Sequence, residues 1–167
     1  LELHEKTAAY YQERLTSPDN ASGAGAYLQK RELTETTPSE YRLGYAPKGF
    51  ETLLTLARSW GFEEKELEES GLFSIRDYPK NGERLFDRFR NRLMFPIFDE
   101  QARVIGFSGR VIPPDDAKAK YMNSPETMLF KKSRVLYGIE KARKPMTDVR
   151  RAILCEGQLD VIRCHEA

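Results

Sequence analysis

The spacing of apolar residues predicts helices in the first part of the chain. One set recurs every four residues and predicts a helix that ends before Ser17: Leu3, Thr7, Tyr11 and Leu15. A second set has the i, i+3, i+4, i+7 spacing of one helix face and is followed by a glycine that stops the helix: Phe50, Leu53, Leu54, Ala57, Trp60 and Gly61. We expect the apolar members of both sets to pack into the core.

Later in the chain the period changes to two, which predicts strands. Residues 93–98 are apolar on both faces, so we expect a strand covered on both sides, with Pro96 at a sheet edge or a bulge. Residues 99–102 form a turn, and residues 103–111 return as the partner strand of a hairpin. In that return strand Arg110 shares a face with small residues, which leaves room for a ligand; the alternative is a bend that needs glycine, beside a surface arginine.

The last part of the chain predicts a strand, a tight turn and a helix. Residues 152–155 are small or apolar and precede Glu156 and Gly157. Asp160 lies one helical turn further on, so both carboxylates can point into the space beyond the strand, where α/β sheets bind ligands. Two hard oxygen donors suit Mg²⁺. The alternative is a solvated glutamate and an aspartate favoured by the helix dipole.

Three segments predict connections. We expect residues 17–25 to be a flexible connection, residues 113–119 a mobile loop, and residues 141–150, with Pro145 among them, a helix end and a linker.

The composition indicates a globular protein. The chain has 167 residues, 40% of them hydrophobic, and no apolar run long enough to cross a bilayer. No signal peptide is visible, and the missing initial Met suggests a piece of a longer chain. Cys155 and Cys164 lack metal-ligand spacing, so we expect packed, reduced thiols, typical of a cytosolic protein.

Charge is distributed unevenly along the chain. Residues 51–77 carry seven acids and three bases, whereas residues 84–134 carry eleven bases and six acids. This asymmetry favours a basic face that binds phosphate, although the charges alone fit a scattered, solvated surface equally well.

Several motifs, in this order along the chain, resemble those of the bacterial DnaG-type DNA primases, and the resemblance covers nearly the whole chain. The motifs are Tyr27-Leu28-Gln29-Lys30-Arg31, Leu43-Gly44-Tyr45-Ala46-Pro47, residues 88–97, residues 104–111, residues 120–127, Phe130-Lys131-Lys132-Ser133-Arg134 with Leu136-Tyr137-Gly138, and residues 156–161.

The resemblance implies an α+β fold and the function of a primase. Mixed helices and an antiparallel hairpin or sheet would occupy residues 1–148, the N-terminal subdomain of the catalytic core. Residues 149–167 would form the first strand and helix of an α/β toprim subdomain. Such an enzyme synthesises RNA primers from ribonucleoside triphosphates on single-stranded DNA.

The resemblance also implies site residues. Glu156 would be the first toprim acid, acting as general base or metal ligand, and Asp160 would lie at the edge of a site for Mg²⁺ or Mn²⁺. The residues implied in binding nucleic acid and nucleotides are Arg31, Arg90, Arg92, Arg110, Lys120, Asn123 and Lys132.

The chain departs from the family pattern in a few places. Ser108 stands where a glycine is usual, and Glu32 follows Arg31 in place of glycine. The later acidic pair of toprim, the zinc-binding module and the helicase-binding module would lie outside this chain, so we expect the fragment to be inactive alone. Contacts with the replicative helicase and the single-strand-binding protein would also use absent parts. We expect a cytoplasmic, nucleoid-associated protein without membrane contact.

Two other functions stay open at this point. One is a single-stranded nucleic-acid-binding module whose carboxylates are vestigial. The other is a different toprim enzyme, a topoisomerase or a nuclease, which the motifs at residues 123–127 and 130–134 disfavour.

Overall fold

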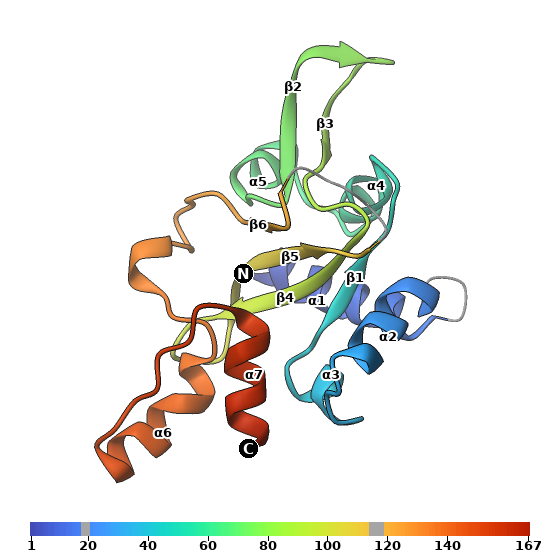
Figure 1. Cartoon of the computed structure of the whole chain (residues 1–167). Helices are drawn as coiled ribbons and strands as arrows, with labels where there is room; N and C mark the ends of the chain where they lie inside the picture. The colour runs from blue at the N-terminus through green and yellow to red at the C-terminus, as the bar shows by residue number, and fades with distance from the viewer. Residues whose placement is uncertain (18–20, 114–118) are drawn as a thin grey trace.

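The computed structural model describes residues 1–17, 21–113 and 119–167, and it combines helices with antiparallel strands (Figure 1). This arrangement confirms the predicted α+β class. The elements in chain order are α1 (Glu2–Thr16), α2 (Ala21–Lys30), α3 (Thr37–Glu40), β1 (Gly44–Ala46), α4 (Thr52–Ser59), α5 (Glu64–Glu69), β2 (Phe73–Lys80), β3 (Glu83–Asp87), β4 (Arg92–Phe98), β5 (Val104–Val111), β6 (Tyr121–Asn123), the 3₁₀ turn η1 (Lys132–Arg134), α6 (Ile139–Val149) and α7 (Gln158–Glu166).

A four-stranded sheet with the order β1-β4-β5-β6 lies at the centre, and its neighbouring strands are antiparallel. The hairpin β4–β5 confirms the prediction for residues 93–111. Its turn is fixed by Asp99, whose Oδ1 accepts hydrogen bonds from the backbone N–H groups of Gln101 and Arg103 at 3.0 Å each. Every residue of β4 is buried, as expected for a strand covered on both faces.

Pro96 lies at an interruption of the sheet. β1 pairs with β4 only from Arg92 to Met94, so the proline is beyond the end of β1. The register between β4 and β5 also shifts between Ile97 and Phe98. A proline has no N–H to donate to a ladder, and both features accommodate it. The expectation of an edge or a bulge is therefore confirmed.

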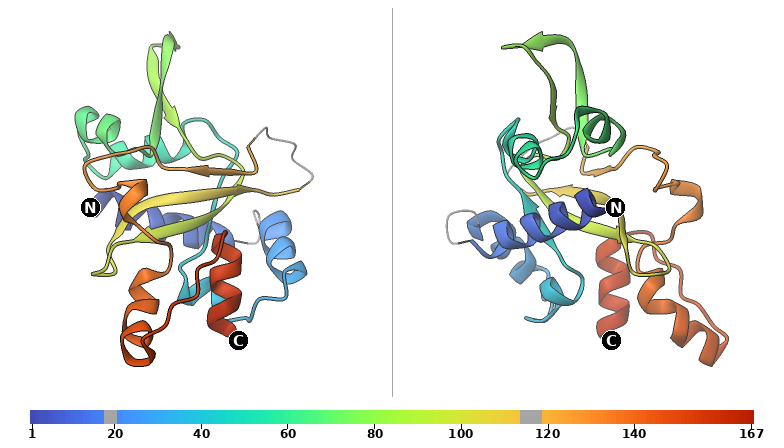
Figure 2. Two further views of the ribbon diagram at one scale, coloured as in Figure 1. Left: turned by 60° about the vertical axis from the view of Figure 1, so that its left-hand side comes forward. Right: turned by 180° about the vertical axis from the view of Figure 1, so that it is seen from behind.

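Helix α1 lies across one face of the sheet, behind it in Figure 1 and in front of it in the right-hand view of Figure 2. The residues predicted to form its inner face are all buried: Leu3, Thr7, Tyr11 and Leu15. The Tyr11 ring meets the Phe107 ring of β5 edge-on at 5.7 Å. A Cβ atom on Gly44 would lie only 2.5 Å from the Cβ of Tyr11, so glycine allows β1 to approach α1.

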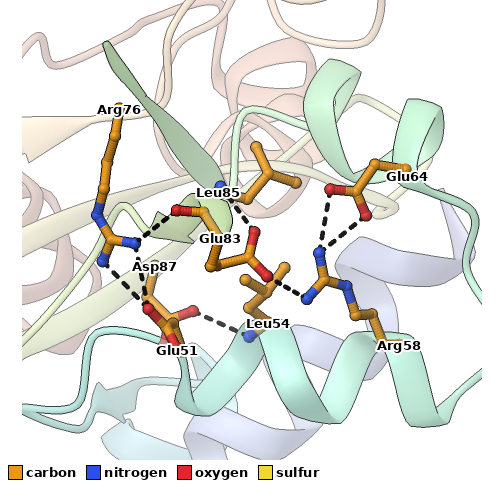
Figure 3. Close-up of polar contacts among 8 residues, drawn as sticks. All are labelled: Glu51, Leu54, Arg58, Glu64, Arg76, Glu83, Leu85 and Asp87. Carbon is orange, nitrogen blue, oxygen red and sulfur yellow. Dashed lines mark hydrogen bonds and ion pairs between the residues drawn. The ribbon is translucent and has the colours of Figure 1, made fainter. Parts of the chain in front are cut away.

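The hairpin β2–β3 projects from the sheet, and charged side chains tie it to helix α4 (Figures 1 and 3). Its turn is Asn81-Gly82, with φ of +53° and +79°, which is typical of a two-residue hairpin turn. Arg58 of α4 pairs with Glu83 of β3 and with Glu64 of α5. These contacts hold the hairpin against both helices.

Helix α4 is placed by a carboxylate at the end of β3. Asp87 accepts hydrogen bonds from the backbone N–H groups of Leu53 and Leu54 at 2.8 and 2.9 Å, which satisfies donors in the first turn of the helix. Leu53, Leu54 and Ala57 are buried, as predicted. Phe50 is 56% exposed, so its predicted place in the core is wrong: the helix starts only at Thr52, and Phe50 leaves the helical face.

Two predicted connections are instead helical. Helix α2 begins at Ala21, within the segment 17–25 that we expected to be flexible, because Ala24 is buried and alanine favours helix. Helix α6 runs from Ile139 to Val149 with Pro145 inside it. The helix end predicted within residues 141–150 is therefore confirmed, whereas the linker predicted there is wrong. Most of the predicted loop 113–119 lies outside the described residues.

The predicted strand at residues 152–155 is absent from the structure. Ile153 and Leu154 are 82% and 83% exposed. A strand forms through hydrogen bonds to a neighbouring strand, and no strand in the described part of the chain pairs with this segment. The prediction of packed thiols is wrong for the same region, because Cys155 is only half-buried and Cys164 is exposed, with their Sγ atoms 3.6 Å apart.

Helix α7 confirms the helix predicted after Gly157. Leu159 and Ile162 are buried in the core. Near the end of the helix, Glu166 accepts hydrogen bonds from the Thr34 backbone N–H at 3.0 Å and from the Thr37 hydroxyl.

Within the described ranges, none of the helices combines the length and the apolar character needed to cross a membrane.

Candidate nucleic-acid interface and carboxylate pair

Arg110 of β5 lies between two tyrosine rings. Its guanidinium carbon is 4.8 Å from the centre of the Tyr27 ring and 5.1 Å from that of Tyr121. Nη1 donates a hydrogen bond to the Tyr121 hydroxyl at 2.6 Å, and Tyr121 is the register partner of Arg110 on β6. The side chain is only 7% exposed, and its Nε has no hydrogen-bond partner among the described residues. The sheet and the two rings thus hold a largely desolvated cation in a fixed position.

Arg31 is joined to this cation through Tyr27. Its Nε donates a hydrogen bond to the Tyr27 hydroxyl at 2.7 Å, and its guanidinium carbon is 5.1 Å from the centre of the Tyr27 ring. Burial raises the pKa of Tyr27, which keeps the hydroxyl neutral, although the two arginines oppose the rise. Sequence reasoning missed Tyr27. Its position four residues before Arg31, on the same face of a helix, was the available signal.

Asn123 ends β6 opposite Ser108. It contacts Arg88, a residue that was not among the predicted site residues. Nε and Nη2 of Arg88 donate to the Asn123 carbonyl, both at 3.4 Å. The Asn123 Oδ1 is buried and has no hydrogen-bond partner within the described ranges. A buried amide oxygen without a partner is uncommon and can mark a site for a ligand or water.

Lys132 and Glu156 line the same cleft as Asn123, which has a volume of about 500 Å³. The backbone N–H of Lys132 donates to the Glu126 carboxylate at 2.8 Å, which fixes the 3₁₀ turn that carries the lysine. Lys120 is exposed just before β6. The structure therefore brings three predicted site residues, Asn123, Lys132 and Glu156, to one cleft, which Lys120 does not line.

Arg92 and Arg90 lie outside this group. Arg92 is 5% exposed, and its Nη1 and Nη2 donate to the carbonyls of Gly109 and Ala119 at 3.0 Å each, so it supports the backbone that leads to Lys120. Arg90 lies at the base of the hairpin β2–β3, with its guanidinium over aromatic rings. Their part in binding nucleic acid stays a prediction.

The two predicted carboxylates are both exposed, Glu156 in the turn before α7 and Asp160 in its first turn. Asp160 and Arg31 line a second cleft of about 270 Å³, together with Lys30 and Arg163. Exposed carboxylates beside open space suit Mg²⁺. Glu156 lines the first cleft and Asp160 the second, so a single space shared by both carboxylates stays a prediction. In the part of the chain that the structure describes, no three His, Cys, Asp or Glu side chains gather as a metal site, so a metal ion bound here would need further ligands.

Comparison with protein families gives a match over most of the chain. Residues 10–143 match the model described as "DNA primase catalytic core, N-terminal domain". The DNA primase of Deinococcus radiodurans is 45% identical over 157 residues, which cover 94% of this chain and 26% of the relative. The DNA primase of Synechococcus elongatus is 40% identical over 95% of this chain and 22% of the relative. The chain thus spans about a quarter of the length of these curated relatives.

Solved structures of similar proteins share the fold. The RNA polymerase domain of Mycobacterium tuberculosis primase DnaG, in complex with a double-stranded DNA oligomer with a 6-nucleotide overhang, has a TM-score of 0.89 and 34% identity. The match covers 99% of this chain and 50% of that one. A DnaG primase catalytic domain bound to single-stranded DNA has a TM-score of 0.82 and 36% identity, over 96% of this chain and 48% of that one.

Proposed function

This chain belongs to the family of DNA primase catalytic cores, as their N-terminal domain, and from that membership we propose that it is the template- and nucleotide-binding part of a primase that synthesises RNA primers on single-stranded DNA. One observation carries the proposal. Tyr27 joins Arg31 to Arg110, and Arg31 shares a cleft with Asp160. The arginines would bind phosphate, and Asp160, beside Arg31 in this cleft, would hold a metal ion. The family favours this function over a topoisomerase or a nuclease.

The cations would bind the phosphates of the template and of incoming ribonucleoside triphosphates. Arg110 is preorganised by the sheet and two rings, so little side-chain entropy is lost when a phosphate binds. Lys120 and Lys132 are exposed and would add sequence-independent attraction. The free Oδ1 of Asn123 can accept a hydrogen bond from a base or a ribose.

The proposed reaction is attack of a ribonucleotide 3′-hydroxyl on the α-phosphate of the next nucleotide, with pyrophosphate leaving. Glu156 and Asp160 would hold Mg²⁺ or Mn²⁺, which when bound neutralises phosphate charge. Phosphoryl transfer depends chiefly on positioning and on stabilising charge, the roles we assign to Arg31 and Arg110. Because no third carboxylate, histidine or cysteine joins them in a metal-binding cluster among the described residues, we propose that this chain alone does not synthesise primers. Residues 149–167 would begin the toprim subdomain.

A salt titration of oligonucleotide binding tests the proposal. Fluorescence anisotropy of a labelled single-stranded oligonucleotide should show weak binding that salt weakens further. The double variant Lys120→Ala, Lys132→Ala should bind more weakly, with a salt slope shallower by about 0.7 for each lost phosphate contact. The matched control is Lys65→Ala, Lys144→Ala, which removes two exposed lysines from α5 and α6 that line neither cleft.

Equal affinity and equal slope in the wild type and the Lys120, Lys132 variant would remove these lysines from the template path. No binding by the wild type would overturn the proposal for this chain. A second assay adds ribonucleotides, Mg²⁺ and a single-stranded template, and we expect no primer from this chain alone. Primer synthesis would contradict the proposal that it lacks part of the active site.

A further inference from the structure

An aromatic–arginine cluster lies on the surface at the base of the hairpin β2–β3. We define the cluster as Phe50, Phe86, Arg76 and Arg90. The Arg90 guanidinium carbon is 4.4 Å from the centre of the Phe50 ring and 5.2 Å from that of Phe86. Arg76 lies 4.9 Å from the centre of the Phe86 ring. Phe50 is 56% exposed, although a ring of this size usually packs into a core.

The two arginines of the cluster differ in their partners. Arg76 pairs with Glu51 at 3.2 Å, as Figure 3 shows. Arg90 donates to the backbone carbonyl of Asp87, whereas the carboxylate of Asp87 is used by the N–H groups at the start of α4. In the described part of the chain no carboxylate forms an ion pair with Arg90. The buried Asp87 carboxylate acts on Arg90 through space, but Arg90 has no ion-pair partner of its own among the described residues and can bind an anion from outside.

The cluster is close in sequence and structure to the proposed template path. Phe89 is buried, whereas its neighbours Arg88 and Arg90 are only partly buried. Arg88 contacts the carbonyl of Asn123 in the candidate interface. The backbone N–H of Asn91 also bonds to the Pro47 carbonyl at 3.1 Å, which ties this loop to the segment that carries Phe50. A short, anchored loop thus connects the two surfaces.

We infer that the aromatic–arginine cluster extends the single-stranded DNA site beyond the candidate interface around Asn123, with Phe50 stacking on a base and Arg90 binding a phosphate. This inference rests on the proposed function. Base–aromatic stacking tolerates any sequence, because every base has a π face. A polyanion also gives the Arg90 guanidinium an ion-pair partner, whereas an apolar peptide would bury it without one. The charge therefore favours a nucleic acid over a hydrophobic protein partner.

Fluorescence anisotropy of single-stranded oligonucleotides of about 4 to 16 nucleotides tests the inference. This range matches the site sizes of OB folds, which also bind single strands. Phe50→Leu keeps an apolar side chain but loses the ring, and it should weaken binding of the longer oligonucleotides at least fivefold while leaving the shortest ones unchanged. Arg90→Gln should weaken the same oligonucleotides and make the salt slope shallower by about 0.7. Phe50→Trp should bind as well as the wild type or better.

Tyr78→Leu is the matched control, because Tyr78 is 86% exposed on the same hairpin and lies outside the cluster. It should bind like the wild type, and thermal unfolding should show that all four variants are folded. If the wild type binds but Phe50→Leu and Arg90→Gln match it at every length, the cluster is only a brace for the hairpin and the inference is wrong. If the wild type binds no oligonucleotide, the proposed function itself fails.

Discussion

The guanidinium of Arg110 lies 4.8 Å from the centre of the Tyr27 ring, so a central strand and an N-terminal helix hold one cation between them. The hydroxyl of the same tyrosine accepts a hydrogen bond from Arg31. Tyr27 therefore has two separable roles: its ring faces one arginine, and its hydroxyl holds the other.

Tyr27→Phe should separate these roles. The variant keeps the ring against Arg110 but loses the hydrogen bond to Arg31, so we expect single-stranded DNA to bind about fivefold more weakly, equal to about 1 kcal/mol. Anisotropy should be measured in the wild type and in Arg31→Ala. The loss should be nearly absent in the Arg31→Ala background, and an equal loss in both would show that Tyr27 does not act through Arg31.

Two glycine substitutions should have opposite effects on stability. Gly44→Ala places a Cβ 2.5 Å from the Cβ of Tyr11 and 2.7 Å from its backbone carbon, and should lower the free energy of unfolding by about 2 kcal/mol or more. Gly23→Ala lies in α2, where the new Cβ would be 3.5 Å from Ile112, an ordinary contact. It should raise stability by up to about 1 kcal/mol, because alanine favours helix. Urea unfolding measures both, and a tolerated Gly44→Ala would contradict the close approach of β1 to α1.

His4 should make the protein less stable at acidic pH. Burial lowers the pKa of His4 from 6.5 to about 4, and its ring stacks on Phe107 with centroids 6.1 Å apart. Below pH 6.5 the unfolded chain takes up a proton that the folded protein does not, so stability falls as the pH drops from about 7 to 4, by about 3 kcal/mol.

The comparison for this prediction is His4→Phe, which keeps a ring but cannot titrate. The stability of the wild type minus that of the variant should fall over this pH range. The wild type alone is not enough, because burial raises the pKa of Asp87 to about 6 and so changes stability in the opposite direction. A difference that stays constant with pH would show that His4 titrates normally in the folded protein.

Asp87→Ala should destabilise the protein by about 2 kcal/mol. The substitution leaves the buried backbone N–H groups of Leu53 and Leu54 without their acceptor at the start of α4. Glu64→Ala removes an exposed partner of Arg58 and should cost less than about 0.5 kcal/mol. Chemical unfolding compares the two variants directly: Asp87 ends β3 and bonds to the first turn of α4, and Glu64 begins α5 (Figure 3). Similar losses would rule out a special capping role for Asp87.

The sequence predicts the elements that local patterns determine. Helix α1 follows from a period of four, and the hairpin β4–β5 from an apolar run, a turn at residues 99–102 and a returning strand, all carried by their own residues. The segment at residues 152–155 has a strand-like composition, but a strand also needs a neighbour, and the neighbour is not encoded in those residues. Phe50 has helical spacing with Leu53, but the start of α4 at Thr52 excludes it from the core.

The candidate site was predictable mainly as a set of charges. Family motifs indicate Arg31, Arg110 and Lys132, and the structure shows which of them meet. The sequence does not reveal that the guanidinium of Arg92 donates hydrogen bonds to backbone carbonyls. These carbonyls belong to Gly109 and Ala119, which are distant from Arg92 along the chain. Tyr27 was also missed, because its hydroxyl gains a role only when α2 reaches β5.

The position of Pro96 has a consequence for the chain while it is being made. β4 is apolar, and β1 pairs only with its first residues, so before the chain has folded and buried this strand, the rest of that edge could pair with a strand of another molecule. A proline within this stretch removes a backbone donor that such an added strand would require. We expect the residue to act as a gatekeeper against aggregation, protecting nascent chains at high concentration while the sheet is still incomplete.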